Sequence, residues 1–461
     1  MAAPAVPVQN PTVSFWRTMV HPIDDQRTTS KLPDTVDVIV IGAGYAGISV
    51  MHHMLELAQN KDIPMPSILL LEAREACSGA TGRNGGHLKP DVCGMATAVA
   101  RNYGLDAAIE CARFEQQHVS ALKELIESED IDCDLILTRC IDVFLDETFL
   151  NETRDKLAEL KRKDVSMMSA IQTLSGTKAE QVSGVKGAKG CITYPAGHLH
   201  PYKLLMHLLS KALDMGVNLQ THTCVKHVTT TPDDDGYATV TTDRGKVRAK
   251  QIVYATNAYT AALLPELKDK IIPVRGTCCR IVPKTSTAVL KNSCTIRRSS
   301  IDSEYLVPLL DGSLVVGGGR VKYYHNKAEW YDNVADDELM RGTHPHFDGY
   351  MQRHFHGWED SEAETQEIWT GIMGHSADGV PFVGNLPDRP NQFIIAGFSG
   401  HGMPQAYLAA KGLASMIIEG ASFHDTKLPK VFEASTKRLK NPVNLVLQNW
   451  QDWRVSVSPK L

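Results

Sequence analysis

The sequence predicts an α/β protein, α+β overall, in which a Rossmann-like dinucleotide-binding domain is interleaved with a domain of antiparallel β-sheet and helix. Three observations support this fold class. A buried-strand pattern over 36–41 runs directly into a glycine-rich turn and then into helical spacing of apolar residues. A second buried strand, 68–71, ends at an acidic residue. A third apolar strand, 393–396, leads into another glycine-rich loop and a helix.

Composition narrows the class of protein further. Of the 461 residues, 43% are hydrophobic and 22% are charged, which is ordinary for a globular chain of two or three domains. The net charge of 48 − 53 = −5 lacks the basic footprint that nucleic-acid binding usually leaves. No apolar run approaches the roughly 18 residues of a membrane span, and the start of the chain does not resemble a secretory signal.

The ten cysteines are scattered along the chain, and none forms a CxxC pair. A disulfide framework is not expected in a chain of this length without a signal peptide. We therefore expect reduced thiols in an intracellular compartment, and we expect the adjacent Cys278 and Cys279 to be ordinary strand residues.

The turn after the first strand has the spacing G-x-G-x-x-G. Its first glycine allows the tight turn, its second lets the backbone approach a pyrophosphate, and its third lets the helix pack close to the strand. The helix N-terminus then faces the phosphate charge, and an acid 25 residues after the third glycine can accept from ribose hydroxyls. The residues expected at this site are Gly42, Gly44, Tyr45, Ala46, Gly47 and Glu72.

The motif alone does not separate FAD from NAD, but the segment after Glu72 does. Residues 73–87 form a loop that is too long and glycine-rich for a simple NAD-binding turn. It supplies Arg83 and many backbone amides, which can contact a diphosphate and the face of a large ring system. The cofactor residues expected here are Ala73, Arg74, Thr81, Arg83, Asn84, Gly85, Gly86 and His87.

The remaining elements follow in order. Residues 105–190 show mostly helical periodicity, strands are expected within 217–240 and over 250–256, and 271–320 is typical of β-hairpins. The strand 393–396 runs into the glycine loop 397–402, whose amides can stabilise negative charge on a reduced flavin. We expect an FAD-binding domain made of 35–90, 191–270 and 366–430, a substrate domain made of 91–190 and 271–365, an arm over 1–34 and a tail over 431–461.

Five motifs occur in the order typical of one family. They are Arg83-Asn84-Gly85-Gly86-His87, Gly197-His198-Leu199-His200-Pro201, Ala255-Thr256-Asn257-Ala258-Tyr259, Pro273-Val274-Arg275-Gly276 and Gly397-Phe398-Ser399-Gly400-His401-Gly402. The sequence thereby resembles the D-amino-acid oxidase-like family of FAD-dependent amine oxidoreductases over most of its length, and within it the gamma-glutamylputrescine oxidase-like branch. The resemblance implies further cofactor contacts at Val225, Thr256, Asn257, Gly374, Gly400, His401, Gly402 and Met403.

Two departures from relatives bear on the chemistry. Sarcosine oxidases of this family attach flavin through a late cysteine, whereas this chain has none after Cys294. We therefore expect non-covalent FAD, with attachment through His87 as the alternative. Pro404 stands where the same relatives place a lysine that holds a substrate carboxylate. Four arginines could replace that lysine: Arg275, Arg297, Arg298 and Arg320.

The resemblance implies an oxidase of an amine or amino acid. Hydride passes from the carbon next to nitrogen to flavin N5, the imine is hydrolysed to a carbonyl, and dioxygen reoxidises the flavin to give hydrogen peroxide. A nearby cation helps oxygen to accept an electron, and the candidates are His87, His401 and Lys291. Aromatic side chains suit an apolar or cationic amine. The substrate residues expected are Arg275, Tyr305, Tyr324, Trp330 and Trp369.

Three other functions stay open from the sequence. They are a flavin dehydrogenase that passes electrons to a carrier, an NAD-linked Rossmann enzyme, and a flavoprotein that binds or shields without turnover; the substrate could also be a specialised biosynthetic amine.

We expect no metal site, since His52 and His53 are adjacent on a helix and should point apart. The expected partners are a small amine and dioxygen, and the oligomeric state stays open. The C-terminal Pro459-Lys460-Leu461 predicts a peroxisomal address, with a cytoplasmic location as the alternative.

Overall fold

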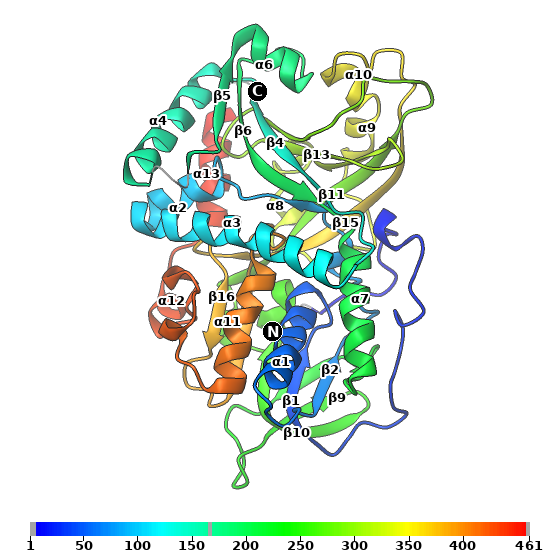
Figure 1. The fold of residues 1–461 in the computed structure, drawn as a ribbon, viewed down its shortest axis with the longest axis vertical. Helices are drawn as coiled ribbons and strands as arrows, with labels where there is room; N and C mark the ends of the chain where they lie inside the picture. Colours follow the sequence, from blue (N-terminus) through cyan, green and yellow to red (C-terminus); the bar gives the residue numbers. More distant parts are fainter. Residues whose placement is uncertain (1–5, 165–167, 458–461) are drawn as a thin grey trace.

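The computed structural model describes residues 6–164 and 168–457, which build two β-sheets with helices packed around them (Figure 1). β1, β2 and β10 mark the first sheet at one end of the molecule, and β4, β6 and β13 mark the second sheet at the other end. No helix within the described ranges is long and apolar enough to cross a membrane. The C-terminal tripeptide of the predicted address lies outside the described residues.

The first sheet is Rossmann-like. Its strands follow the order β16-β17-β10-β1-β2-β7, and all neighbours from β17 to β7 are parallel. β16 is an antiparallel edge strand, and β8 and β9 form a hairpin joined to β10. The bounds are β1 Thr35–Ile41, β2 Ile68–Leu71, β7 Asn218–Gln220, β8 Val225–Val228, β9 Ala238–Thr242, β10 Gly245–Tyr254, β16 Phe382–Asn385 and β17 Gln392–Ala396.

The apolar sequence of β1 reflects burial on both faces of this sheet. Val38 and Val40 join the core beneath the helices, whereas Ile39 and Ile41 join the core on the opposite face. Each such side chain contributes about 1.5–3 kcal/mol when fully buried. On one face α1 packs against both α11 and α7 (Figure 1). The bounds of these helices are α1 Tyr45–Asn60, α7 Pro201–Asp214 and α11 Ala406–Glu419.

The second sheet is mostly antiparallel. Its order is β15-β11-β14-β13-β12-β4-β6-β3, β5 pairs with β6, and the pair β12–β4 is parallel. The bounds of its strands are β3 His87–Leu88, β4 Ile136–Phe144, β5 Gln172–Ser175, β6 Gly190–His198, β11 Ile271–Val282, β12 Ser293–Arg297, β13 Ser303–Pro308, β14 Leu314–Gly318 and β15 Glu364–Ser376. Its helices include α2 Met95–Tyr103, α3 Leu105–Ser128, α4 Glu147–Lys163, α6 Gly176–Ser183, α8 Lys327–Trp330, α9 Thr343–Phe347 and α10 Tyr350–His354.

The structure differs from the sequence-based expectations mainly in this second sheet. β4 and β5 lie inside the stretch that we expected to be mostly helical. β4 has polar residues at Thr138, Arg139 and Asp142 and is flanked by two amphipathic helices, which hid its strand pattern. β6 and β15 also pair within the second sheet, although most of their residues fall in ranges expected for the FAD-binding domain.

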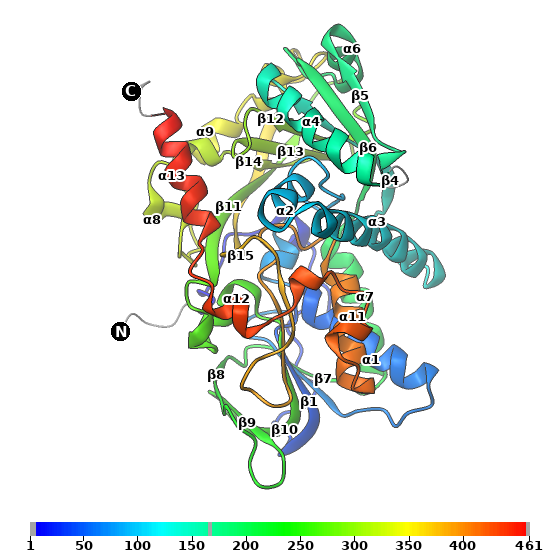
Figure 2. The same cartoon turned by 90° about the vertical axis from the view of Figure 1, so that its left-hand side faces the viewer.

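Both ends of the described chain are tied to the body of the protein. In the N-terminal arm, Trp16 is buried, and its Nε1 donates to the carbonyl of Asn84 at 2.5 Å. At the other end α12 (Thr436–Lys440) precedes α13 (Leu445–Val457), which runs beside α8 and α9 (Figure 2). Trp450 of α13 donates from Nε1 to the carbonyl of Tyr324 at 2.9 Å.

Candidate cofactor and active site

A cavity of about 650 Å³ is lined by residues of both sheets. It runs past the glycine turn, the loop after β2, the β8 strand and the late glycine loop. The structure brings to it most of the predicted cofactor residues: Gly42, Gly44, Tyr45, Ala46, Glu72, Ala73, Arg74, Thr81, Arg83, Asn84, Gly85, His87, Val225, Thr256, Asn257, Gly400, His401, Gly402 and Met403. Gly47, Gly86 and Gly374 lie behind the lining, where they permit close packing of backbone.

The glycine turn follows the geometry that its spacing predicts. Gly42 has φ +109°, and a Cβ there would lie 2.6 Å from the carbonyl oxygen of Ala255. A Cβ on Gly47 would overlap the carbonyl oxygen of Gly42. The first and third glycines are therefore required by backbone packing, and the open turn leaves room for a diphosphate at the start of α1.

Glu72 stands beside this turn at the end of β2. Its Oε2 accepts from the amide of Ala43 at 2.9 Å, and its Oε1 accepts from the amide of Arg74 at 3.0 Å. Two backbone donors thus fix the carboxylate on the cavity wall, in the place where the Rossmann arrangement puts a ribose ligand.

Arg74 and Arg83 line the cavity, but both guanidinium groups already interact with a carboxylate and carbonyls of the protein. Arg74 forms a two-pronged ion pair with the buried carboxylate of Asp336, at 3.0 and 3.1 Å. Arg83 lies 3.6 Å from the same carboxylate and donates to the carbonyl of Thr370 at 2.7 Å. Burial lowers the pKa of Arg83 to about 10, against the opposing effect of Asp336. Asp336 lies far along the chain, and sequence patterns gave no sign of this pairing.

The N-terminal arm forms part of the cavity wall, which the sequence did not reveal. Val6 and Pro7 line the cavity, and the carbonyl of Val8 accepts from Arg74 at 3.1 Å. Thr12 donates from its backbone amide to the carbonyl of Asp336 at 2.7 Å and accepts from Arg83. The arm therefore closes over the same arginines that the loop after β2 presents.

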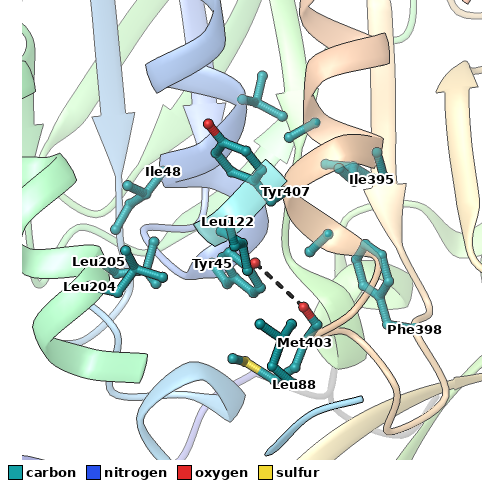
Figure 3. Packing of buried hydrophobic residues seen from close by; sticks show 14 of the residues in the cluster. Tyr45, Ile48, Leu88, Leu122, Leu204, Leu205, Ile395, Phe398, Met403 and Tyr407 are labelled. Atoms are coloured by element: carbon teal, nitrogen blue, oxygen red, sulfur yellow. Dashed lines mark hydrogen bonds between the residues drawn. The ribbon is translucent and has the colours of Figure 1, made fainter. Parts of the chain in front are cut away.

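Tyr45, predicted at the cofactor, turns its ring away into the core (Figure 3). Its hydroxyl lies 3.1 Å from His118 Nε2 and donates to the carbonyl of Met403 at 3.5 Å. This contact links the start of α1 to the late glycine loop, which lies between β17 and α11. Tyr45 is thus a positioning residue for the loop.

The three predicted oxygen-activating candidates lie in different environments. His401 lines the cavity with Nε2 3.1 Å from Glu115 Oε1; burial opposes its charged form, but Glu115 raises the pKa of the imidazole. His87 also lines the cavity, bonded through Nε2 to Ser293 Oγ at 2.7 Å, and burial lowers its pKa well below the usual value. Lys291 is exposed and lies outside the lining. Of the three, His401 alone both lines the cavity and, among the described residues, has a carboxylate within 4 Å.

A buried cluster of four charges stands beside these histidines. Arg297 donates to Asp91 at 2.7 Å and to Asp142 at 2.8 Å, and Lys89 Nζ lies 3.4 Å from Asp142 and donates to Thr295 Oγ1 at 3.0 Å. Burial opposes these charges, yet the partners lower the pKa of Asp91 and raise that of Lys89. Our sequence reading missed the cluster, although Lys89 and Asp91 directly follow the cofactor loop and could have been flagged there.

Of the predicted substrate residues, Tyr305 lines the cavity. Its ring lies between Gly85 and Gly317, where a Cβ on either glycine would overlap it, and its hydroxyl lies 3.1 Å from Cys278 Sγ. The others lie outside the lining and are held elsewhere. Arg275 donates to the carbonyls of Glu329 and Glu338, Trp369 donates to the carbonyl of Arg83 at 2.8 Å, and Tyr324 stacks on Trp330 at 4.6 Å.

His52 and His53 do not point apart as we expected. Their ring centroids lie 5.2 Å apart, and with Glu56 they form a group of three possible ligands whose atoms lie within 4.8 Å of one another. His53 contacts Glu56 Oε2 at 3.1 Å and the carbonyl of Tyr407 at 3.2 Å. These contacts attach α1 to α11, on the helix-covered face of the first sheet.

Comparison with known sequences agrees with this geometry. The sequence model of the DAO family, described as FAD dependent oxidoreductase, matches residues 37–416. The chain therefore belongs to the DAO family of FAD-dependent oxidoreductases, an enzyme family whose members act on amines and amino acids.

Particular relatives refine the likeness. Gamma-glutamylputrescine oxidoreductase of Escherichia coli is 25% identical over 396 residues, covering 83% of this chain and 84% of the relative. Glycine oxidase of Bacillus licheniformis is 22% identical and covers 83% and 93%. Among solved structures, glycine oxidase from Geobacillus kaustophilus has a TM-score of 0.69 at 18% identity, covering 88% of this chain and 99% of that one. L-proline dehydrogenase from P. horikoshii also reaches 0.69, at 17% identity, covering 87% and 98%.

The residues present fit FAD. Gly42 and Gly47 leave no room for a side chain in the turn, Glu72 is fixed beside it, and the same cavity is also lined by residues of the second sheet. Gly42, Gly44 and Glu72 would hold the adenosine diphosphate part of FAD, and the loop Gly400 to Met403 would lie at the flavin edge.

Proposed function

We propose that the protein is an FAD-dependent oxidase of an amine or amino acid, whose products are an imine, hydrolysed to a carbonyl, and hydrogen peroxide. The observation that carries the proposal is one cavity that joins a dinucleotide cradle on the first sheet to a wall that holds His401 and its partner Glu115. The name of the gamma-glutamylputrescine oxidoreductase relative supports an amine as substrate.

FAD, when bound, supplies the hydride acceptor and the electrons that reduce dioxygen. The chain supplies position and charge. The imidazolium of His401 and the N-terminal end of α11, which begins at Ala406, place positive potential beside the late glycine loop. Glu115 raises the pKa of His401 and so favours its charged form, and Glu115 itself accepts from the amide of Asp91 and from Gln405 Nε2.

We further propose that the cofactor is held without a covalent bond. Cys77, Cys224 and Cys278 line the cavity, and burial raises the pKa of Cys77 well above its usual value and that of Cys278 to about 11. Because the thiolate is the reactive form, the buried thiols of Cys77 and Cys278 are poor nucleophiles. Yellow colour should stay in the supernatant after acid precipitation; colour in the pellet contradicts the proposal.

Peroxide release from the holoenzyme in air tests the function. The panel holds primary amines, N-methyl amines, γ-glutamyl amines, polyamines, and L- and D-amino acids. We expect one compound class to release peroxide in proportion to flavin turnover. Faster turnover with an artificial electron acceptor than with oxygen would instead identify a dehydrogenase.

One finer point, the location of the protein, belongs to the same proposal. The last three residues direct the protein to the peroxisome, where catalase consumes peroxide. A fluorescent protein fused in front of the last twelve residues should become punctate, and it should stay diffuse when Leu461 is deleted. Diffuse signal from the intact tail would favour the cytoplasm.

A further inference from the structure

A second cluster of chemically active side chains lies outside the cavity, on the helices that cover the first sheet. α1 carries His52, His53 and Glu56, and α11 packs beside it (Figure 1). Residues three and four positions apart share a helix face, so Glu56 lies one turn beyond both histidines. One candidate ligand atom from each of the three side chains lies within 4.8 Å of the other two. The three residues therefore form a compact group of two imidazoles and a carboxylate.

The imidazole of His53 faces an acceptor on each side. Nε2 lies 3.2 Å from the carbonyl oxygen of Tyr407, and Nδ1 lies 3.1 Å from Glu56 Oε2. A carbonyl oxygen only accepts, so Nε2 carries the hydrogen of a neutral ring, and Nδ1 then presents a lone pair to the carboxylate. Two acceptors at this distance repel each other unless a positive charge is bound to them. Either a second proton on the ring or a metal ion has to supply that charge.

His52 distinguishes the proton from the metal ion. Its side chain is 7% exposed, and its Nε2 is buried without a hydrogen-bond partner among the described residues. A proton shared by His53 and Glu56 leaves the ring of His52 unsatisfied, which costs free energy. A metal ion bound by all three residues gives that ring a partner. The unpartnered nitrogen therefore favours the metal ion.

The spacing of the group suits a zinc ion. Bonds of about 2.0–2.1 Å in a tetrahedral site set neighbouring ligand atoms about 3.3 Å apart. The observed separation of His53 Nδ1 and Glu56 Oε2 is 3.1 Å. The second ring nitrogen of a zinc-binding histidine usually donates to a carbonyl or carboxylate, as Nε2 of His53 does to Tyr407. The side chain of Glu56 is 47% exposed, so an ion from solution can reach the group.

We propose that His52, His53 and Glu56 bind a zinc ion, or another divalent cation that prefers imidazole, with water completing its coordination. This inference goes beyond the proposed function and does not depend on it. His53 is bonded to the backbone of α11, which follows the late glycine loop, and α1 begins at the glycine turn. The ion therefore fastens together the two helices that carry both cofactor loops, and its binding stabilises the folded protein.

Zinc titration of the FAD-loaded protein, freed of metal by a chelator and followed by calorimetry, tests the site. We expect one zinc ion per chain and no binding of Mg²⁺, which prefers oxygen ligands. Glu56→Gln, at an exposed position, and His52→Leu, which removes an unpartnered buried nitrogen, should each weaken zinc binding at least about tenfold. Glu152→Gln, at an exposed position of α4, is the matched control and should bind zinc as the wild type does. Zinc should also raise the thermal midpoint of the wild type and of this control, but of neither ligand variant.

Three results would overturn the site. Zinc that binds Glu56→Gln or His52→Leu as tightly as the wild type lies elsewhere, for example on a thiol. Equal binding of Mg²⁺ would indicate nonspecific contact with carboxylates. Failure of the wild type to bind zinc would mean that a proton on His53 supplies the charge. Each outcome is read from binding and melting, so none depends on whether an amine reduces the flavin.

Discussion

The two ends of the cavity are built in different ways. The first-sheet end is made largely of backbone and one carboxylate from the stretch Gly42 to Glu72, to which Val225 and Ala255 are added from later in the chain. The second-sheet end is made of side chains from several strands, held by buried ion pairs such as Arg297 with Asp142. This difference explains why the cofactor end could be recognised from a sequence motif. The substrate end could not, because the contacts that build it join residues far apart in the sequence.

The largest effect is expected where a long-range pair is broken. Asp142→Ala removes the carboxylate shared by Arg297 and Lys89 and leaves two buried cations without it. We expect a loss of about 3–5 kcal/mol in stability, seen as a lower thermal midpoint of the holoenzyme. Asp132→Ala, whose side chain is 89% exposed, is the control and should change the midpoint little. Equal midpoints for the two variants would mean that the second-sheet end does not depend on its ion pairs.

A smaller effect is expected at the backbone-built end. Gly47→Ala places a Cβ on the carbonyl of Gly42 and forces the turn apart. FAD affinity should fall about 10- to 100-fold, measured by the ratio of flavin to protein after dilution. Ser49→Ala, in the same helix, removes a buried hydroxyl that has no partner in the described structure and should retain FAD. Full FAD content in Gly47→Ala would show that the glycine is replaceable.

The charge on His401 predicts a pH dependence. Because Glu115 raises the pKa of His401, the imidazolium persists above the usual range and is lost as pH rises through that pKa. Reoxidation of reduced flavin by oxygen should therefore slow at high pH, and Glu115→Gln should move the midpoint to lower pH. Stopped-flow reoxidation measures this directly. A midpoint that is the same in both proteins would assign the titration to another group.

The smallest effect is expected at Lys291. Its side chain is exposed and away from the cavity, so Lys291→Met should leave oxygen reoxidation within about twofold of the wild type. A tenfold slower reoxidation would make Lys291 a candidate for oxygen activation again. It would also mean that a residue outside both ends of the cavity takes part in the reaction.

The sequence predicted those parts of the fold and site that are determined by residues close together in the chain. The strand, the glycine turn, the helix and Glu72 are set by neighbouring residues, so their arrangement could be predicted, and the family confirms the cofactor. β4 was missed because Thr138, Arg139 and Asp142 interrupt its apolar residues, so that neither a continuous buried run nor a strict alternation is visible. The partners of Arg74 and Arg275 could not be foreseen, since Asp336 and the 329–338 segment meet them only through the fold.

The N-terminal arm has a consequence for the order in which the enzyme is assembled. Thr12 hydrogen-bonds to Asp336, which lies 324 residues later in the chain. This wall of the cavity therefore joins residues that are synthesised at very different times. The glycine turn and β2 emerge early, but the wall over Arg74 and Arg83 closes only after most of the chain has been synthesised. Cofactor capture is therefore a late event, and nascent chains stalled before residue 336 should hold FAD only loosely.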